Sequence, residues 1–166
     1  EKLSLPGGGA FDHAMKLFNQ SGLRAPVEEL IFNGKTPVLG ICVGMQMLAD
    51  ASEEGELPGL GWIGGRVTRV AAESASDLVR LPHMGWNTVQ VSGNSTLFRG
   101  LEVDARFYFL HSFYFAARQE EHVLASVEYG NRFTCSVGKE QVMGVQFHPE
   151  KSHHFGEKLL QNFAES

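Results

Sequence analysis

The sequence predicts a single α/β domain with a central, mostly parallel sheet, helices on both of its faces and an antiparallel hairpin region in its second half. Three observations support this architecture. The chain begins with an apolar stretch, a glycine loop and a helical pattern; a continuous apolar run then enters a turn between two glycines; and the second half alternates strand patterns with turn residues. With 166 residues the chain is long enough for one well-buried core, so residues 1–166 are assigned to one domain.

The first half is predicted to begin with an α/β unit and to continue with a second helix and a second strand. Residues 2–6 are predicted as a short strand, residues 7–9 as a glycine loop and Gly22 as the end of the following helix. A second helical pattern ends near Gly34, and residues 37–41 form a continuous apolar strand of the kind that parallel sheets cover on both faces. A third helix is expected after this strand. Apolar residues at helical spacing support these helices: Phe11, Ala14, Met15 and Phe18 in the first, Val27, Leu30 and Ile31 in the second, and Met45, Leu48 and Ala49, expected to point inward, in the third.

The second half is predicted to consist mainly of strands. It follows a polar, glycine-rich loop at residues 52–61, and turn residues separate its segments. A closing helix carries four apolar residues on one face, Phe155, Leu159, Leu160 and Phe163. The predicted strands are residues 65–70, 86–91, 106–115, 123–129, 133–137 and 142–147.

Composition and charge argue against several classes of protein. A formal net charge of -5 and the lack of a Lys/Arg cluster give no electrostatic basis for binding nucleic acid or an anionic membrane, so we expect neither partner. No apolar stretch approaches the ~18 residues of a membrane span, and no export signal is visible. The two cysteines, Cys42 and Cys135, offer no disulfide framework or paired metal-ligand spacing, which predicts a reducing, cytoplasmic setting.

Cys42 lies between Gly40 and Gly44 in the stretch VLGICVGMQML, at residues 38–48. One interpretation is a nucleophile elbow, in which a strand turns sharply into a helix and the two glycines remove side chains that would collide there. At the start of a helix, free N–H groups and the helix dipole would favour the thiolate over the thiol. The other interpretation is a buried cysteine that acts as a small hydrophobic residue. This stretch alone does not decide between the two.

His148 and Glu150 could supply the base that a cysteine nucleophile needs. In QFHPEKS the histidine directly follows a strand, where active-site loops of open α/β sheets gather. Pro149 stiffens the link, so the Glu150 carboxylate could bond the far imidazole nitrogen. Alternatively, His148 only ends a strand and Glu150 caps the next helix. The spacing to His153 and His154 fits no standard zinc pattern, so we expect no metal.

Two segments could form an oxyanion hole from backbone N–H groups. The loop LPGGG would contribute Gly7, Gly8 and Gly9 from a strand end, and Val43 directly follows the candidate nucleophile. LPGGG is not a phosphate loop, because the Lys-Ser/Thr ending is missing. A plain tight turn is the alternative.

These motifs together resemble those of the class I (triad) glutamine amidotransferases, and within them the glutaminase subunits of imidazole glycerol phosphate synthase. Six segments occur in the family's order and span nearly the whole chain. They are LPGGGAFDHAM, PVLGICVGMQML, SEEG with PGLG, LPHMGWN, FYFLHSFYF and QFHPEKS. The resemblance implies a flavodoxin-like three-layer fold and an enzyme without a cofactor.

The resemblance also implies a role for each motif. Cys42 would attack the side-chain amide of glutamine, His148 would act as general acid and base, and Glu150 would orient the imidazole. The N–H groups of Val43 and residues 7–9 would hold the oxyanion, and a γ-glutamyl thioester would yield glutamate and ammonia. The implied glutamine-binding positions are Gly44, Gln46, Ser112 and Phe113.

A partner is implied as well. Ammonia would pass through a channel to a (β/α)8 cyclase of histidine biosynthesis, with which the chain would form a heterodimer. From the residues alone, Met84 and Trp86 are more typical of a strand core. The positions that match the partner face are His83, Met84, Gly85, Trp86, Asn87 and Lys151.

The chain departs from the family pattern at three places. Gly8 stands where the family usually has a branched apolar residue, which predicts a more mobile loop. Phe113 replaces the tyrosine of the HSY motif, and this removes a hydroxyl. The family has an additional strand, helix and strand before LPG, including an Asp-Tyr-Gly segment. Without these elements a doubly wound sheet would have a bare edge or face, so we expect the chain to be N-terminally incomplete.

Three other functions remain open. A paralogous glutaminase subunit would feed another acceptor, for example a sugar amidotransferase of surface polysaccharide synthesis. A catalytically idle subunit would keep the fold only for docking. A cysteine peptidase would use the same elbow, although GMQ, HSF and HPEKS argue against it.

Overall fold

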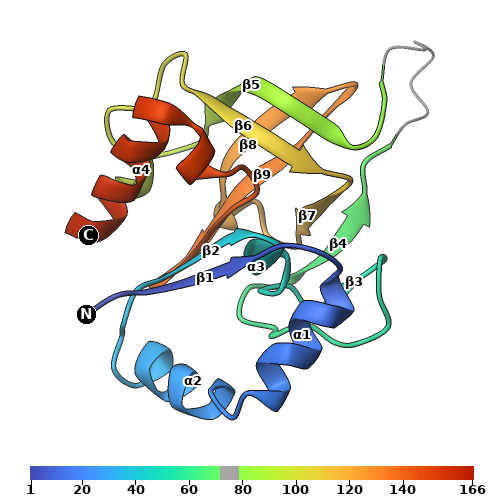
Figure 1. The fold of residues 1–166 in the computed structure, drawn as a ribbon. Helices are drawn as coiled ribbons and strands as arrows, with labels where there is room; N and C mark the ends of the chain where they lie inside the picture. Colours follow the sequence, from blue (N-terminus) through green and yellow to red (C-terminus); the bar gives the residue numbers. More distant parts are fainter. Residues whose placement is uncertain (72–78) are drawn as a thin grey trace.

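The computed structural model describes residues 1–71 and 79–166 (Figure 1). Its main feature is a seven-stranded sheet with the order β1-β2-β10-β9-β8-β5-β6. These strands are β1 (Leu3–Gly7), β2 (Val38–Cys42), β5 (His83–Val91), β6 (Arg106–His111), β8 (Val123–Tyr129), β9 (Asn131–Lys139) and β10 (Val142–Val145). A smaller sheet has the order β3 (Ala51–Ser52), β4 (Gly65–Arg69) and β7 (Phe113–Ala117).

The parallel part of the large sheet is smaller than the sequence predicted. β2 pairs in parallel with β1 on one side and with β10 on the other, whereas every pairing from β10 to β6 is antiparallel. Parallel neighbours need a long crossover connection, and antiparallel neighbours need only a tight turn. Helices cross over between β1 and β2, while a turn at Gly130 joins β8 to β9. The α/β class is confirmed, with a mixed sheet in place of a mostly parallel one.

One predicted strand, residues 106–115, forms two strands in different sheets. β6 ends at His111 and belongs to the large sheet, and β7 begins at Phe113 and belongs to the small one. Ser112 lies between them, and its carbonyl accepts a hydrogen bond of 2.9 Å from the N–H of Val70. This change of sheet places residues 112 and 113 beside the end of β2, in the wall of the cavity that also holds Cys42.

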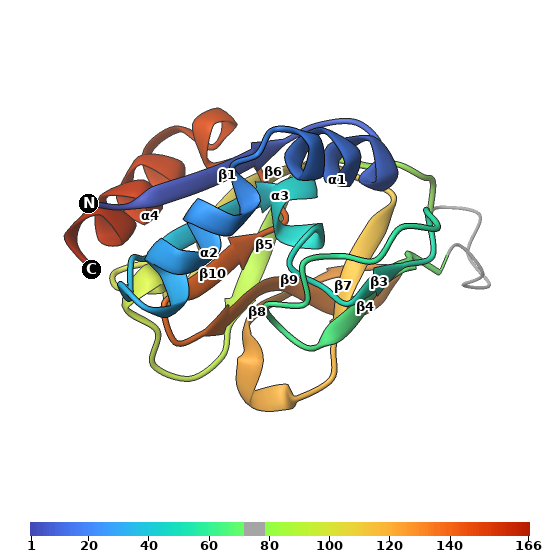
Figure 2. The ribbon, with the colours of Figure 1, turned by 90° about the horizontal axis from the view of Figure 1, so that it is seen from below.

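Helices lie on both faces of the sheet (Figures 1 and 2). α1 (Phe11–Gln20) and α2 (Arg24–Phe32) bury Phe11, Met15 and Ile31 in one core cluster. On the other side α4 (His153–Glu165) buries Leu159 and Phe163 in a second cluster. Successive residues of a strand point to opposite faces, so the continuous apolar β2 supplies both clusters, as expected for a strand that is covered twice. Among the described residues, no helix is long and apolar enough to span a bilayer.

The shorter helical elements lie at the ends of strands. α3 (Val43–Gln46) is only one turn long, although Leu48 and Ala49 beyond it are fully buried as the helical pattern predicted. The structure describes three short 3-10 helices within residues 1–71 and 79–166: η1 (Thr96–Phe98), η2 (Glu120–His122) and η3 (Pro149–Lys151).

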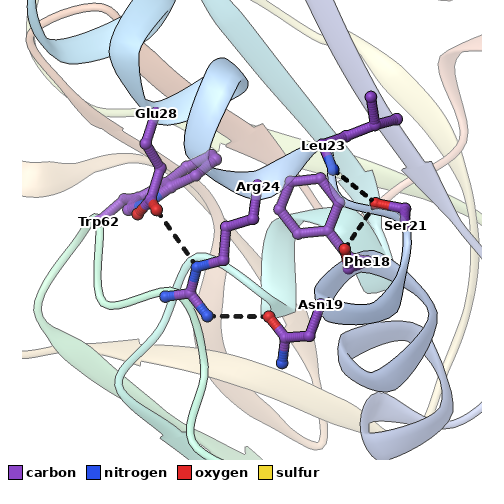
Figure 3. Close-up of polar contacts among 7 residues, drawn as sticks. All are labelled: Phe18, Asn19, Ser21, Leu23, Arg24, Glu28 and Trp62. Carbon is purple, nitrogen blue, oxygen red and sulfur yellow. Dashed lines mark hydrogen bonds and ion pairs between the residues drawn. The ribbon is translucent and has the colours of Figure 1, made fainter.

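Polar contacts hold α2 against the loop that precedes β4 (Figure 3). A carboxylate oxygen of Glu28 accepts a hydrogen bond of 2.9 Å from the indole N–H of Trp62, and the other accepts one of 3.3 Å from Arg24. Arg24 also donates to the side-chain oxygen of Asn19 in α1, at 2.9 Å. These contacts link the end of α1 and the start of α2 to one buried tryptophan.

Candidate active site

The backbone of Cys42 turns sharply between β2 and α3. Its φ of 56° and ψ of −114° lie in a region that side-chain-bearing residues rarely adopt. Such a conformation costs about 1–3 kcal/mol and persists only where the surroundings enforce it. This is the geometry of a nucleophile elbow, and it places the Cys42 side chain in a cavity at the end of the parallel strands.

Three glycines allow the backbone to pack closely behind this turn. A Cβ atom on Gly44 would lie 1.7 Å from the carbonyl oxygen of Leu5, and one on Gly40 would lie 2.6 Å from the carbonyl oxygen of Gly44. A Cβ on Gly7 would lie 3.0 Å from the amide nitrogen of Gly44. The backbones of β1, β2 and α3 therefore approach each other too closely for a side chain at Gly40 or Gly44, and leave little room for one at Gly7. The prediction that Gly40 and Gly44 make room for the elbow agrees with this packing.

Burial raises the pKa of the Cys42 thiol, which contradicts the expectation of a favoured thiolate. The N–H of Val43 lowers this pKa by a smaller amount, the Glu150 carboxylate raises it, and Lys151 lowers it again. The thiol donates to the carbonyl oxygen of Leu110 at 4.0 Å and accepts from the side-chain amide of Gln146 at 3.8 Å. A one-turn helix supplies too few aligned N–H groups to outweigh desolvation. The resting cysteine is a thiol that needs a base.

Alkylation should distinguish Cys42 from Cys135. Cys135 is fully buried in β9 and burial raises its pKa strongly, whereas Cys42 lines an open cavity. We expect iodoacetamide to modify Cys42 at least about tenfold faster than Cys135 in the folded protein, because only Cys42 is reachable and close to a base. Peptide mass spectrometry over a time course measures both rates. Equal rates in the folded protein would count against a reactive Cys42.

His148 lies just beyond β10 and points its imidazole toward the same cavity. Nδ1 of His148 lies 2.7 Å from a carboxylate oxygen of Glu150, as the HPE spacing predicted. The backbone is held from two sides, since the His148 N–H donates to the carbonyl of Tyr108 at 2.9 Å and Ser152 Oγ donates to the His148 carbonyl at 2.6 Å. In the part of the chain that the structure describes, no hydrogen bond joins His148 to Cys42. Nε2 of His148 is therefore available to substrate or thiol.

The cavity has a volume of about 310 Å³ and brings most of the predicted residues together. Gly7 is not among its lining residues and borders an adjoining hollow, while Gly44 packs against Leu5 behind the elbow. Glu150 also lies outside the cavity and reaches it through His148. The predicted residues that line the cavity are Gly8, Gly9, Cys42, Val43, Gln46, Ser112, Phe113 and His148.

Two buried glutamines form part of the cavity's support. Nε2 of Gln46 donates to the carbonyl of Phe113 at 3.1 Å and to Oε1 of Gln146 at 3.0 Å. Gln146, which is fully buried, uses its own amide N–H to reach Cys42. Sequence reasoning gave Gln146 no role. The sequence feature that could have indicated a role is its position, since Gln146 is a polar residue directly after the apolar residues that lead to His148.

Glu54 lines the cavity, and sequence reasoning missed it as well. Its carboxylate accepts a hydrogen bond of 2.7 Å from the N–H of Phe11, at the start of α1. Asp12 in turn accepts from the N–H groups of Glu56 and Leu57, at 2.9 and 3.0 Å. These bonds attach the polar loop at residues 52–61 to the start of α1, which follows the glycine loop. The SEEG motif was visible in the sequence, but its partner lies 43 residues away.

The predicted partner residues separate onto two faces of β5. Met84 and Trp86 are 64% and 40% exposed, so the reading of these two as core residues is wrong. His83 is buried, and Asn87 turns inward to bond His83 and the carbonyl of Glu128. Strand alternation explains the split, since neighbouring residues point to opposite faces. Lys151 lies near the outer face, with Nζ 5.9 Å from the centre of the Tyr108 ring.

The comparison with known families decides the identity. Residues 6–166 match the family description "Glutamine amidotransferase class-I". The chain belongs to the class I glutamine amidotransferases. In this amidotransferase domain the elbow cysteine, the glycine loop and His148, which is paired with Glu150, line one cavity.

Relatives of this amidotransferase carry a more specific name. A protein of Bdellovibrio bacteriovorus, "Imidazole glycerol phosphate synthase subunit HisH", is 57% identical over 164 residues, which cover 99% of this chain and 80% of the relative. A Leptospira borgpetersenii protein of the same name is 48% identical over the same shares. A solved structure titled "Crystal structure of glutamine amidotransferase" has a TM-score of 0.71 at 23% identity, covering 98% of this chain and 79% of that one. The last likeness concerns the fold alone.

Proposed function

We propose that the chain hydrolyses glutamine to glutamate and ammonia, as the glutaminase subunit of an imidazole glycerol phosphate synthase in histidine biosynthesis. The observation that carries the proposal is the cavity lined by a strained cysteine, by the glycine loop and by a histidine that is paired with Glu150. The 57% identity to a HisH subunit supports the choice of pathway. The intact cysteine, histidine and glutamate argue against an idle docking subunit.

The first chemical step is attack of Cys42 Sγ on the side-chain amide carbon of glutamine. The raised pKa of the thiol means that a base must take its proton, and Nε2 of His148 is free to do so. Glu150 accepts from Nδ1–H, which fixes the tautomer with a free Nε2 and stabilises the imidazolium. The same proton then goes to the departing nitrogen, and ammonia leaves.

The oxyanion of the tetrahedral intermediate would be held by backbone N–H groups. Val43, Gly8 and Gly9 line the cavity around Cys42, and the N–H of Val43 already interacts with the thiol. Loss of one such donor typically costs roughly 10²- to 10³-fold in rate. Water, deprotonated by His148, would then cleave the thioester on Cys42, releasing glutamate and restoring the thiol.

The far wall of the cavity would recognise the amino-acid end of glutamine. Glu54 places a carboxylate there, suited to the substrate ammonium, and Oε1 of Gln46 is a further acceptor because both N–H bonds of that amide are used elsewhere. The main chain of Ser112 and Phe113 borders the same wall and would bind the substrate carboxylate.

The ammonia acceptor would be a (β/α)8 cyclase that forms a heterodimer with the chain, so the assembly as a whole acts as a lyase. The exposed Met84, Trp86 and Lys151 lie on the outer side of β5 and η3 and supply an apolar and cationic face for it. Both cysteines are free thiols, which suits a cytoplasmic location.

Glutamate release tests the proposal. We expect low release from glutamine by the chain alone and a severalfold rise when the cyclase carrying its ligand is added, because partner contact completes the site. Asparagine, peptides and esters should not be hydrolysed. Hydrolysis of peptides or esters in preference to glutamine would contradict the proposal. Stimulation by a sugar amidotransferase but not by the cyclase would assign the glutaminase to polysaccharide synthesis instead.

A further inference from the structure

A chain of buried hydrogen bonds runs from β5 to the wall of the cavity. Nδ2 of Asn87 lies 3.3 Å from Nε2 of His83, and Nδ1 of His83 lies 2.9 Å from Nε2 of His111. Nδ1 of His111 lies 2.8 Å from the carbonyl oxygen of Phe113. Both histidines are buried, and His111 also lines the cavity.

The partners allow only one direction of donation along this chain. A carbonyl oxygen only accepts, so Nδ1 of His111 carries the proton and its Nε2 is an acceptor. His83 must then donate from Nδ1 and accept at Nε2 from the amide of Asn87. Burial lowers the pKa of His83 to about 3 and that of His111 to about 4, so both rings are neutral at physiological pH, as the chain requires.

The chain ends on the carbonyl that Gln46 also uses. The oxygen of Phe113 accepts from Nε2 of Gln46 at 3.1 Å as well as from His111, so both of its acceptor positions are occupied. The preceding carbonyl, of Ser112, is held by the N–H of Val70. The main chain at residues 112 and 113, where β6 ends and β7 begins, is thus held at both carbonyls.

We propose that His111 and His83 are positioning residues for glutamine recognition: their hydrogen bonds orient the Phe113 carbonyl, and through it Gln46 and the main chain at residues 112 and 113. The inference rests on the proposed glutaminase function. The inferred role concerns glutamine binding and not the chemical step, because Cys42 and Glu150 take no part in this chain of hydrogen bonds.

Packing alone does not require these rings to be histidines. His83 is stacked between Phe109 and Tyr129, with ring centres 4.6 and 4.2 Å away, and a phenylalanine would fill that position equally well. Buried imidazoles in an aromatic cluster cost desolvation, which only directed hydrogen bonds offset. The presence of hydrogen-bonded histidines here therefore indicates that they orient the Phe113 carbonyl, on which the hydrogen bonds end.

Nitrogen NMR of the wild-type protein tests the direction of donation. With ¹⁵N-labelled histidine, long-range proton–nitrogen correlations should place the proton of both His83 and His111 on Nδ1 at neutral pH. Single substitutions assign the signals. A proton on Nε2 of His111 would overturn the inference, since the Phe113 carbonyl would then receive nothing from the ring.

Steady-state kinetics of the protein with its cyclase tests the consequence. His111→Phe removes both bonds and should raise KM for glutamine by about tenfold, the equivalent of one hydrogen bond, with a much smaller change in kcat. His83→Phe should do the same less strongly. His111→Asn should recover part of the loss, because its amide nitrogen takes the place of Nδ1 and still donates to Phe113.

His122→Phe is the matched control. His122 is also buried, but its Nδ1 has no hydrogen-bond partner among the described residues, so the substitution should leave KM unchanged. An unchanged KM in folded His83→Phe and His111→Phe, with normal wild-type turnover, would overturn this inference alone. Absence of wild-type glutamine turnover in the complex would instead contradict the proposed function and the recognition role with it.

Discussion

Cys42→Ala is expected to abolish glutamine hydrolysis. The substitution removes the only described sulfur in the cavity, and with it the atom that would form the thioester. Removal of a catalytic nucleophile costs on the order of 10⁶-fold in kcat, so glutamate release should fall below detection in a coupled dehydrogenase assay. Glutamine should still bind, because the groups proposed to hold its amino and carboxylate ends are untouched.

Cys135→Ala is the matched control for this experiment. Cys135 is fully buried in β9 and lies outside the cavity, so its loss should leave hydrolysis intact and lower the free energy of unfolding by only about 1 kcal/mol. Full activity in Cys42→Ala would refute the mechanism outright. Loss of activity in both variants with loss of structure would show that folding, not chemistry, was affected.

A glycine at the same position separates chemistry from strain. Cys42 has a φ of 56°, a value that glycine adopts without the steric cost that alanine has. Cys42→Gly should therefore be as inactive as Cys42→Ala but more stable by about 1 kcal/mol. Urea unfolding of both variants measures the difference, and a less stable glycine variant would mean that the elbow is not strained.

Gly44→Ala is expected to damage both stability and activity. The new Cβ would lie 1.7 Å from the carbonyl oxygen of Leu5, so α3 and β1 must separate. Overpacking of this kind costs about 3 kcal/mol, and a shift near 1 Å between nucleophile and oxyanion loop can lower kcat by roughly 10²-fold. Urea unfolding and glutamate release on the same sample measure the two losses.

Gly8→Ala is the control for the stability effect. A Cβ on Gly8 would meet no atom within 4 Å, and Gly8 is not among the glycines with a positive φ. Its free energy of unfolding should change by less than about 1 kcal/mol. If Gly44→Ala proved as stable as Gly8→Ala, the close approach of β1 to α3 would not be a constraint on the sequence.

The local geometry of the site was predictable from short stretches of sequence. The glycines around Cys42 and the two-residue spacing from His148 to Glu150 act over a few bonds, where chain geometry leaves few choices. Both predictions agree with the structure, in the positive φ of Cys42 and the 2.7 Å contact of the His-Glu pair. The family resemblance, now shown over residues 6–166, rested on the same stretches.

Other parts of the site depend on contacts between distant segments. Glu54 bonds Phe11 across 43 residues, Gln146 reaches Gln46 across 100, and His83 meets His111 across 28. No local pattern reports which distant partner a polar side chain finds. His83 points inward and Met84 outward because of the position of β5 in the sheet. The alternation of residues in the sequence did not by itself show which of them would face the core.

The sequence by itself determined the α/β class and the family and singled out the residues proposed to perform glutamine hydrolysis, because these follow from local spacing and from motif order. Tertiary structure alone decided the mixed direction of the sheet, the split of residues 106–115 between two sheets and the raised pKa of Cys42. The physical reason is the same in each case. Strand direction and desolvation depend on what packs around a residue, and the neighbours that bury Cys42 include Leu110 and Gln146, which lie 68 and 104 residues away along the chain.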